Sequence, residues 1–194
     1  MGATIELAGG VIEAHAPHGL HGAAIDLPMP SVGATENLLI AAVLARGTTE
    51  IRNAAREPEV TDLAHCLVAM GAGIEGVGGP VLVIEGDRPL RGAQHTVLPD
   101  RIEIGTMACA AALTDGELLL QGADAVLLGA AGPILAEAGV VLEPVAEGLV
   151  ARRAAGSNES RPRVDTRYAY GVQSSPQSLC GRIVDRMSNA LSGS

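Results

Sequence analysis

The stretch Met70-Gly71-Ala72-Gly73-Ile74-Glu75 repeats Met1-Gly2-Ala3-Thr4-Ile5-Glu6, which begins 69 residues earlier. The pair Gly9-Gly10 returns as Gly78-Gly79 at the same offset, and Ala138-Gly139-Val140 is a third, more distant copy. A fixed period of this length indicates a duplicated supersecondary unit. We therefore expect a fold built from repeated units of about 69 residues.

The order of elements within one unit follows from its hydrophobic period, which switches between strand-like alternation and helical spacing. The pattern predicts βαβαββ, an α/β (α+β) fold. We expect a first helix at 34–45, with Gly47 as a left-handed C-cap, and a second at 59–70, between Pro58 and a closing Gly71. The expected strands lie at 10–14, 24–27, 49–53, 73–77 and 81–85.

The second copy begins near Pro89 and should follow the same order. Its second helix contains Gly132-Pro133, and proline removes a backbone donor and clashes with the preceding turn. We therefore expect that helix to be broken or kinked. Residue 1 aligns with Met70, the end of a second helix, so the chain is expected to be a fragment that begins within a unit.

Composition excludes several classes of function. The net charge of -9 and the pI near 4.9 argue against a nucleic-acid partner, because such proteins need a basic face. The longest apolar run, 38–45, is far shorter than the ~20 residues of a membrane span. Three widely spaced cysteines suit a reducing cytoplasm, and we interpret Cys66 and Cys109 as small core residues. His15, His18 and His21 lie in an expected turn and are interpreted as solvated rather than metal-binding.

The end of the chain differs in composition from the rest. Residues 1–156 contain a single serine, Ser31, whereas residues 157–194 contain eight. We expect an enzyme-type domain at 1–156 and an aberrant or disordered tail at 157–194. A disordered natural tail, a basic interaction tail and a segment translated out of frame are the three alternatives, and the third is favoured.

The main candidate for a binding site is the segment 30–37, which reads Pro-Ser-Val-Gly-Ala-Thr-Glu-Asn and lies between an expected strand and the first helix. We expect backbone N–H groups and the hydroxyls of Ser31 and Thr35 to point outward from the helix N-terminus. Such a terminus attracts phosphate, because its unpaired N–H groups and dipole favour negative charge. The alternative is a simple N-cap without a ligand.

Several motifs resemble one family in order and spacing. They are 31–37 (Ser-Val-Gly-Ala-Thr-Glu-Asn), 45–49 (Ala-Arg-Gly-Thr-Thr), 53–59 (Asn-Ala-Ala-Arg-Glu-Pro-Glu) and 98–103 (Leu-Pro-Asp-Arg-Ile-Glu). Over residues 1–153 the chain resembles the UDP-N-acetylglucosamine enolpyruvyl transferases. The resemblance implies inside-out barrel domains and transfer of the enolpyruvyl group of phosphoenolpyruvate to the sugar 3-hydroxyl of UDP-N-acetylglucosamine. This is the first committed step of peptidoglycan synthesis, and it needs no metal or other cofactor.

The resemblance also implies site residues. The substrate-binding residues would be Pro30, Ser31, Val32 and Gly33, of which the last three would contact the UDP portion and Pro30 flanks them. Some family members carry lysine where this chain has Met29. The cleft-lining candidates are Glu57, Arg56 and Arg101, for which intradomain salt bridges are the alternative.

The same resemblance implies that much of the chemistry lies outside the chain. The family's active-site cysteine and the residues that contact phosphoenolpyruvate are expected in a sister domain, before residue 1. The segment that bears the general base is expected after Arg153, where this chain departs from the family pattern. We therefore expect the isolated chain to be inactive. The alternatives are a non-catalytic binding or scaffold module of the same fold and an enzyme like enolpyruvylshikimate phosphate synthase.

Overall fold

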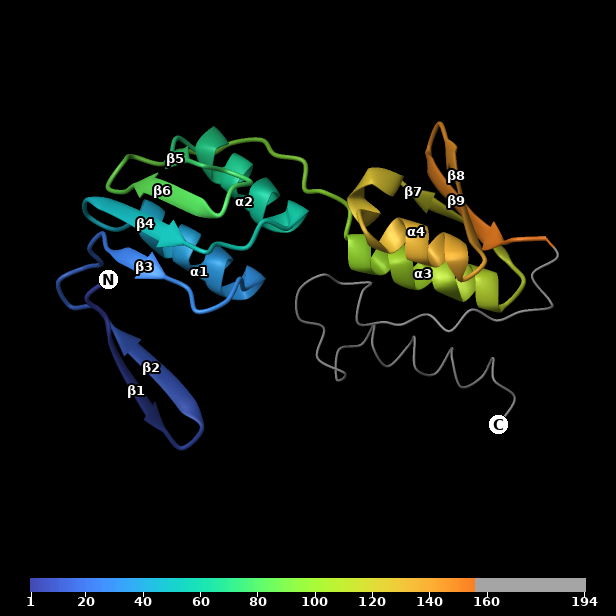
Figure 1. The fold of residues 1–194 in the computed structure, drawn as a ribbon. Helices are drawn as coiled ribbons and strands as arrows, with labels where there is room; N and C mark the ends of the chain where they lie inside the picture. Colours follow the sequence, from blue (N-terminus) through green and yellow to red (C-terminus); the bar gives the residue numbers. More distant parts are fainter. Residues whose placement is uncertain (156–194) are drawn as a thin grey trace. The chain divides into compact units, whose positions relative to one another are not determined.

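The computed structural model describes residues 1–155 and divides the chain into two compact units, with the boundary between Leu98 and Pro99 (Figure 1). The tail predicted for 157–194 lies outside the described residues, and the domain limits 1–156 stay a prediction. Among residues 1–155, none of the helices has the length and apolar composition needed to cross a bilayer.

Unit 1 follows the predicted order βαβαββ. Its elements are β3 (Ala24–Asp26), α1 (Val32–Val43), β4 (Thr48–Arg52), α2 (Pro58–Ala69), β5 (Gly73–Glu75) and β6 (Val81–Glu85). The strand order is β3-β4-β6-β5, with β3 parallel to β4 and the other pairs antiparallel. Both helices pack against the sheet (Figure 1), and Leu39 of α1 is fully buried with Ile51, Leu82 and Ile84 of the strands. This α/β arrangement confirms the predicted fold class.

The helix ends test the predicted caps. Helix α1 begins at Val32, two residues before the prediction, because Ser31 is the N-cap, and it ends at Val43 with Leu44 as the C-cap. The prediction of Gly47 as the C-cap was therefore wrong: Gly47 has a φ of +88° but lies in the turn before β4. Helix α2 runs from Pro58 to Ala69, one residue earlier at each end than the predicted 59–70, and Gly71 follows the C-cap Met70 with a φ of +108°.

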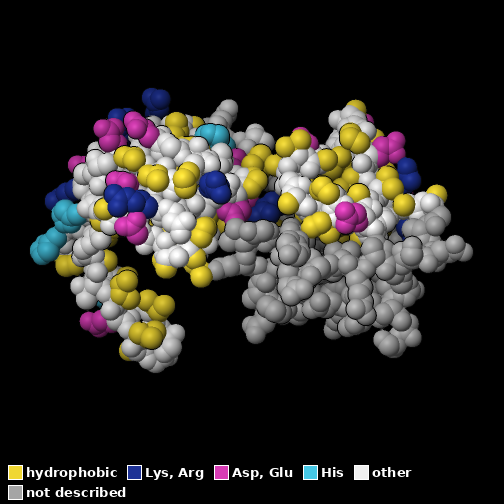
Figure 2. All heavy atoms as spheres, in the orientation of Figure 1, with side chains coloured by type: hydrophobic (Ala, Val, Ile, Leu, Met, Phe, Trp, Pro, Cys, Tyr) yellow, Lys and Arg dark blue, Asp and Glu magenta, His cyan; other side chains and the backbone are white. Residues whose placement is uncertain are grey.

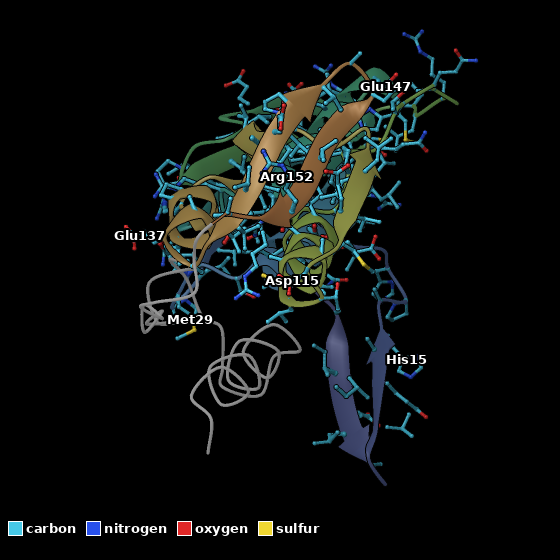
Figure 3. All side chains as sticks on the ribbon, turned by 90° about the vertical axis from the view of Figure 1, so that its right-hand side faces the viewer. His15, Met29, Asp115, Glu137, Glu147 and Arg152 are labelled. Carbon is cyan, nitrogen blue, oxygen red and sulfur yellow. The ribbon has the colours of Figure 1, made fainter. Side chains whose placement is uncertain are left out.

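The first two strands form a separate hairpin. Strand β1 (Thr4–Ala8) pairs antiparallel with β2 (Val11–His15), and Gly9 and Gly10 form the turn with φ values of +59° and +80°. Every residue of both strands is exposed, including apolar side chains visible along the hairpin in Figure 2. Figure 3 shows His15 directed away from the hairpin.

Unit 2 repeats the later part of the pattern. Its elements are α3 (Arg101–Leu113), β7 (Glu117–Gln121), the 3-10 helix η1 (Ala125–Leu128), α4 (Ala131–Glu137), β8 (Val140–Val145) and β9 (Gly148–Arg153). Strand β7 lies 69 residues after β4 at both ends. The predicted break is confirmed, because the second helix is divided into η1 and α4, with Gly129 at a φ of +48° between them. Pro133 lies in the first turn of α4, where an N–H has no intrahelical partner.

The first strand of the second copy is the main departure from the repeat. Residues 93–95, which match β3, form no strand, and the sheet of unit 2 has the order β7-β9-β8. This segment is instead attached to α2 of unit 1. His95 Nε2 lies 2.9 Å from Asp62 Oδ1, and the Leu98 N–H donates to Asp62 Oδ2 at 3.4 Å.

Candidate functional site

The loop between β3 and α1 is anchored at its start to the end of β4. The Leu27 N–H donates to the Arg52 carbonyl at 3.1 Å, and Asn53 Nδ2 donates to the Leu27 carbonyl at 3.0 Å. Asn53 has a φ of +56°, a left-handed conformation that asparagine tolerates better than most residues. These two contacts fix where the chain leaves the sheet toward Ser31.

Ser31 caps α1 and leaves the helix end open. Ser31 has extended backbone angles, and its Oγ accepts a hydrogen bond from the Ala34 N–H at 3.3 Å. The N–H groups of Val32 and Gly33 precede the first helical bond and have no intrahelical acceptor. Gly33 is exposed, and a Cβ added to it would meet nothing within 4 Å. With a neutral cap and no acidic residue in the first turn, this end of the helix favours an anion.

Thr35 corrects the prediction for this loop. Its hydroxyl was expected to point outward toward phosphate, but the side chain is fully buried. Thr35 Oγ1 donates to the Ser31 carbonyl at 2.8 Å and accepts from the Ala55 N–H at 3.0 Å. The reason is helical geometry, because a residue four positions after the N-cap lies on the same face and one turn below it. Thr35 is therefore a link beneath the loop and not a ligand contact.

The turn before α2 lies at the other end of this link. Ala54 and Ala55 are buried, whereas Arg56 is exposed and Glu57 is half-buried. The Arg56 N–H donates to Glu57 Oε2 at 2.9 Å, which holds the carboxylate over the start of α2. Neither charged side chain forms an ion pair with another residue of the described range. Unit 1 thus brings the Ser31–Gly33 loop and the Arg56–Glu57 turn together through Thr35.

Arg101 and Met29 are two further positions that stand out in the sequence, and neither adds a positive charge to the Ser31–Gly33 loop within unit 1. Arg101 is the half-buried first residue of α3 and belongs to unit 2, whereas the Ser31 loop belongs to unit 1. Met29 is 49% exposed and extends outward from the loop (Figure 3), so this position supplies an apolar thioether and no positive charge. Positive charge near the Ser31–Gly33 loop therefore comes from Arg56, in the turn that Thr35 links to this loop.

Electrostatics near the loop include one shifted group. Partial burial, and then the negative charge of Glu59, raise the pKa of Glu36 above its ordinary value. Among residues 1–155 no group of three or more His, Cys, Asp and Glu side chains could hold a metal ion. Cys109 is buried as predicted, whereas Cys66 is half-buried.

Comparison with known proteins places these features in a family. The family model for EPSP synthase (3-phosphoshikimate 1-carboxyvinyltransferase) matches residues 1–163. The UDP-N-acetylglucosamine 1-carboxyvinyltransferases of Granulibacter bethesdensis and Acidiphilium cryptum are each 58% identical to this chain over 156 residues. Each match covers 80% of this chain and 37% of the relative, so the chain spans a little over a third of these relatives. The resemblance predicted from the motifs is confirmed.

Solved structures agree with this assignment. The enolpyruvyl transferase NikO from Streptomyces tendae matches with a TM-score of 0.68 and 28% identity, over 80% of this chain and 40% of NikO. An EPSP synthase from Acinetobacter baumannii has a TM-score of 0.52 and 24% identity, which supports the fold alone. The repeated βαβαββ unit, the open N-terminus at Ser31 and these matches lead to one conclusion. The chain belongs to the EPSP synthase family of enolpyruvyl (carboxyvinyl) transferases.

Proposed function

We propose that this chain supplies the nucleotide-sugar-binding part of a transferase that moves the enolpyruvyl group of phosphoenolpyruvate to the 3-hydroxyl of UDP-N-acetylglucosamine. The reaction would serve peptidoglycan synthesis in the cytoplasm. The names of the relatives at 58% identity favour this acceptor over shikimate 3-phosphate, because the EPSP synthase from Acinetobacter baumannii is only 24% identical to the chain. The small number of cysteines, three at wide spacing, is consistent with a reducing compartment.

The open end of α1 is the observation that carries the proposal. The diphosphate of a UDP-sugar needs N–H donors and a positive field, and the amides of Val32 and Gly33 supply both beside a neutral Ser31 cap. Pro30 holds the approach to the cap in a restricted conformation. The missing side chain of Gly33 leaves room for phosphate oxygens close to the backbone.

The charged candidates have complementary roles in this proposal. Arg56 is exposed and supplies positive charge for a polyanionic substrate, and the Glu57 carboxylate can accept hydrogen bonds from sugar hydroxyls. Arg101 remains a predicted substrate contact of unit 2. No described residue is assigned to proton transfer, so we expect the chain by itself to bind the nucleotide sugar and to show no turnover.

Titration of the 15N-labelled chain with UDP-N-acetylglucosamine tests the proposal. We expect saturable shifts of the Val32 and Gly33 amide signals, and weaker or no shifts with shikimate 3-phosphate. Saturable shifts with shikimate 3-phosphate alone would favour the synthase alternative. No shifts with either ligand at millimolar concentration would contradict the proposal and favour a scaffold module. Release of phosphate from phosphoenolpyruvate by the pure chain would contradict the predicted inactivity.

A further inference from the structure

Thr35 is a buried polar residue that joins two segments far apart in the sequence. Its side chain is fully buried, and its Oγ1 is bonded on both sides, to the Ser31 carbonyl and to the Ala55 N–H. The Ser31 carbonyl also accepts the Thr35 N–H at 2.9 Å, so two of the three bonds end on the cap residue. The third bond crosses from residue 35 to residue 55, which directly precedes Arg56.

The second copy of the repeat shows that the fold does not require this hydroxyl. Residue 104 lies 69 positions after Thr35, at the matching place in α3, and it is Ile104 with a 6% exposed side chain. The cap residues match in the same way, because Asp100 lies 69 positions after Ser31. An aliphatic side chain therefore fills this core position when the loop above it has an acidic cap. Thr35 occurs in the copy whose helix is capped by serine, and Ile104 occurs in the copy whose helix is capped by aspartate.

We propose that Thr35 is a positioning residue for nucleotide-sugar binding. Its hydroxyl fixes the spacing between the Ser31–Gly33 loop and the Arg56–Glu57 turn, so that one ligand can contact both. A buried hydroxyl with both a donor and an acceptor partner is costly to remove, because the two partner groups are left unsatisfied. The inference rests on the proposed function, since the ligand is the UDP-sugar assigned to the loop.

Three variants of the whole chain distinguish a positioning role of the Thr35 hydroxyl from a role of the Thr35 side chain in core packing. Thr35→Val removes the hydroxyl and keeps the shape, whereas Thr35→Ser keeps the hydroxyl. Thr49→Val is the matched control, because Thr49 is also fully buried in unit 1 but its Oγ1 has no hydrogen-bond partner among the described residues. Comparing melting curves of Thr35→Val and Thr49→Val shows whether the first variant remains folded.

For Thr35→Val we expect UDP-N-acetylglucosamine affinity to fall about tenfold, which corresponds to roughly one lost net hydrogen-bond contribution. Thr35→Ser should bind within about twofold of the wild type, and Thr49→Val should bind unchanged. Amide hydrogen exchange should accelerate at Ala55 in Thr35→Val and not in Thr35→Ser. A folded Thr35→Val that binds as tightly as the wild type would overturn the inference.

Failure of the proposed function gives a different result. If the wild-type chain shows no saturable binding, the proposed function fails, and exchange at Ala55 decides the positioning role. The link between the turns is upheld if amide exchange at Ala55 is faster in Thr35→Val and returns to the wild-type rate in Thr35→Ser. The amide signals of both Ser31 and Arg56 should then also change in Thr35→Val. Unchanged exchange in Thr35→Val overturns the link. If Thr35→Val does not fold, loss of binding in a folded Thr35→Ser likewise overturns the role of the hydroxyl.

Discussion

The two copies of the repeat begin their first helix at matching positions but cap it differently. In α1 the neutral Ser31 hydroxyl accepts one hydrogen bond, from a backbone N–H at 3.3 Å. In α3 the Asp100 carboxylate accepts two, from the N–H groups of Ile102 at 2.7 Å and Glu103 at 3.4 Å. The carboxylate both satisfies the helix end and offsets its positive field. The repeat therefore specifies where the helix begins, whereas the cap residue determines whether the helix N-terminus can bind an anion.

The cores of the two units differ as well. In unit 1 the continuous helix α2 buries Val60, Ala64 and Leu67, and a single cluster of buried residues joins helices and sheet. In unit 2 the second helix is broken, and the buried residues form two smaller clusters. We therefore expect unit 1 to be the more stable of the two.

The largest expected effect comes from giving unit 1 a core residue of unit 2. Leu39 and Ala108 occupy matching positions, 69 residues apart, and both are fully buried. Leu39→Ala should lower the free energy of unfolding of unit 1 by about 2–5 kcal/mol, because it leaves a cavity. Urea denaturation followed through amide signals of each unit measures this.

The matched control for that change lies in the other copy. Ala108→Leu overpacks its cluster in unit 2 and should destabilise unit 2 by about 1–3 kcal/mol while leaving unit 1 unchanged. A loss below about 1 kcal/mol for Leu39→Ala would show that the core of unit 1 can collapse around the missing side chain.

The caps give an intermediate effect. Asp100→Ala removes a side chain that accepts two amides and should destabilise α3 by about 1 kcal/mol. Ser31→Ala removes a single, longer bond and should cost about half as much. Amide exchange in the first turns of α3 and α1 compares the two. Equal losses, or a larger loss at Ser31, would contradict the contrast between the caps.

The smallest expected effect concerns pH. Because the pKa of Glu36 is raised in the folded chain, its deprotonation costs stability, and this cost appears as pH rises through the folded pKa. Glu36→Gln should therefore stabilise unit 1 at pH 7, by less than about 0.5 kcal/mol, since the side chain is only half-buried and solvent screens its charge. The gain should disappear below the ordinary pKa of a glutamate. Denaturation at pH 7 and pH 3.5 tests this, and a gain that grows in acid would contradict it.

Much of the fold could be predicted because local patterns specify it. Strand β6 matches its predicted limits of 81–85, and Pro58 and Gly71 mark helix boundaries through backbone chemistry alone. Gly132-Pro133 predicted the break in the second helix of unit 2, although the break itself lies at Gly129 and Pro133 falls in the first turn of α4. The missing strand at 93–95 could not be predicted, because this segment instead makes a tertiary contact, between His95 and Asp62, which lie 33 residues apart in the sequence. No local pattern contains such a pair.

The candidate site divides in the same way. Ser31 and Gly33 could be recognised from a motif and from the known preference for serine at helix N-termini. The inward direction of Thr35 could not, because it depends on the Ala55 amide 20 residues away. The signal that could have found it is the repeat itself, since the position 69 residues later holds a buried isoleucine.

The central claim is that the neutral cap at Ser31 leaves α1 open for the diphosphate of UDP-N-acetylglucosamine. The most direct test is Ser31→Asp, which gives α1 the cap of α3 and should preserve the helix while opposing an anion. Titration of wild type and variant with UDP-N-acetylglucosamine should show saturable binding for the first and an affinity at least about tenfold lower for the second. Equal affinity, with α1 intact in both, would contradict the account.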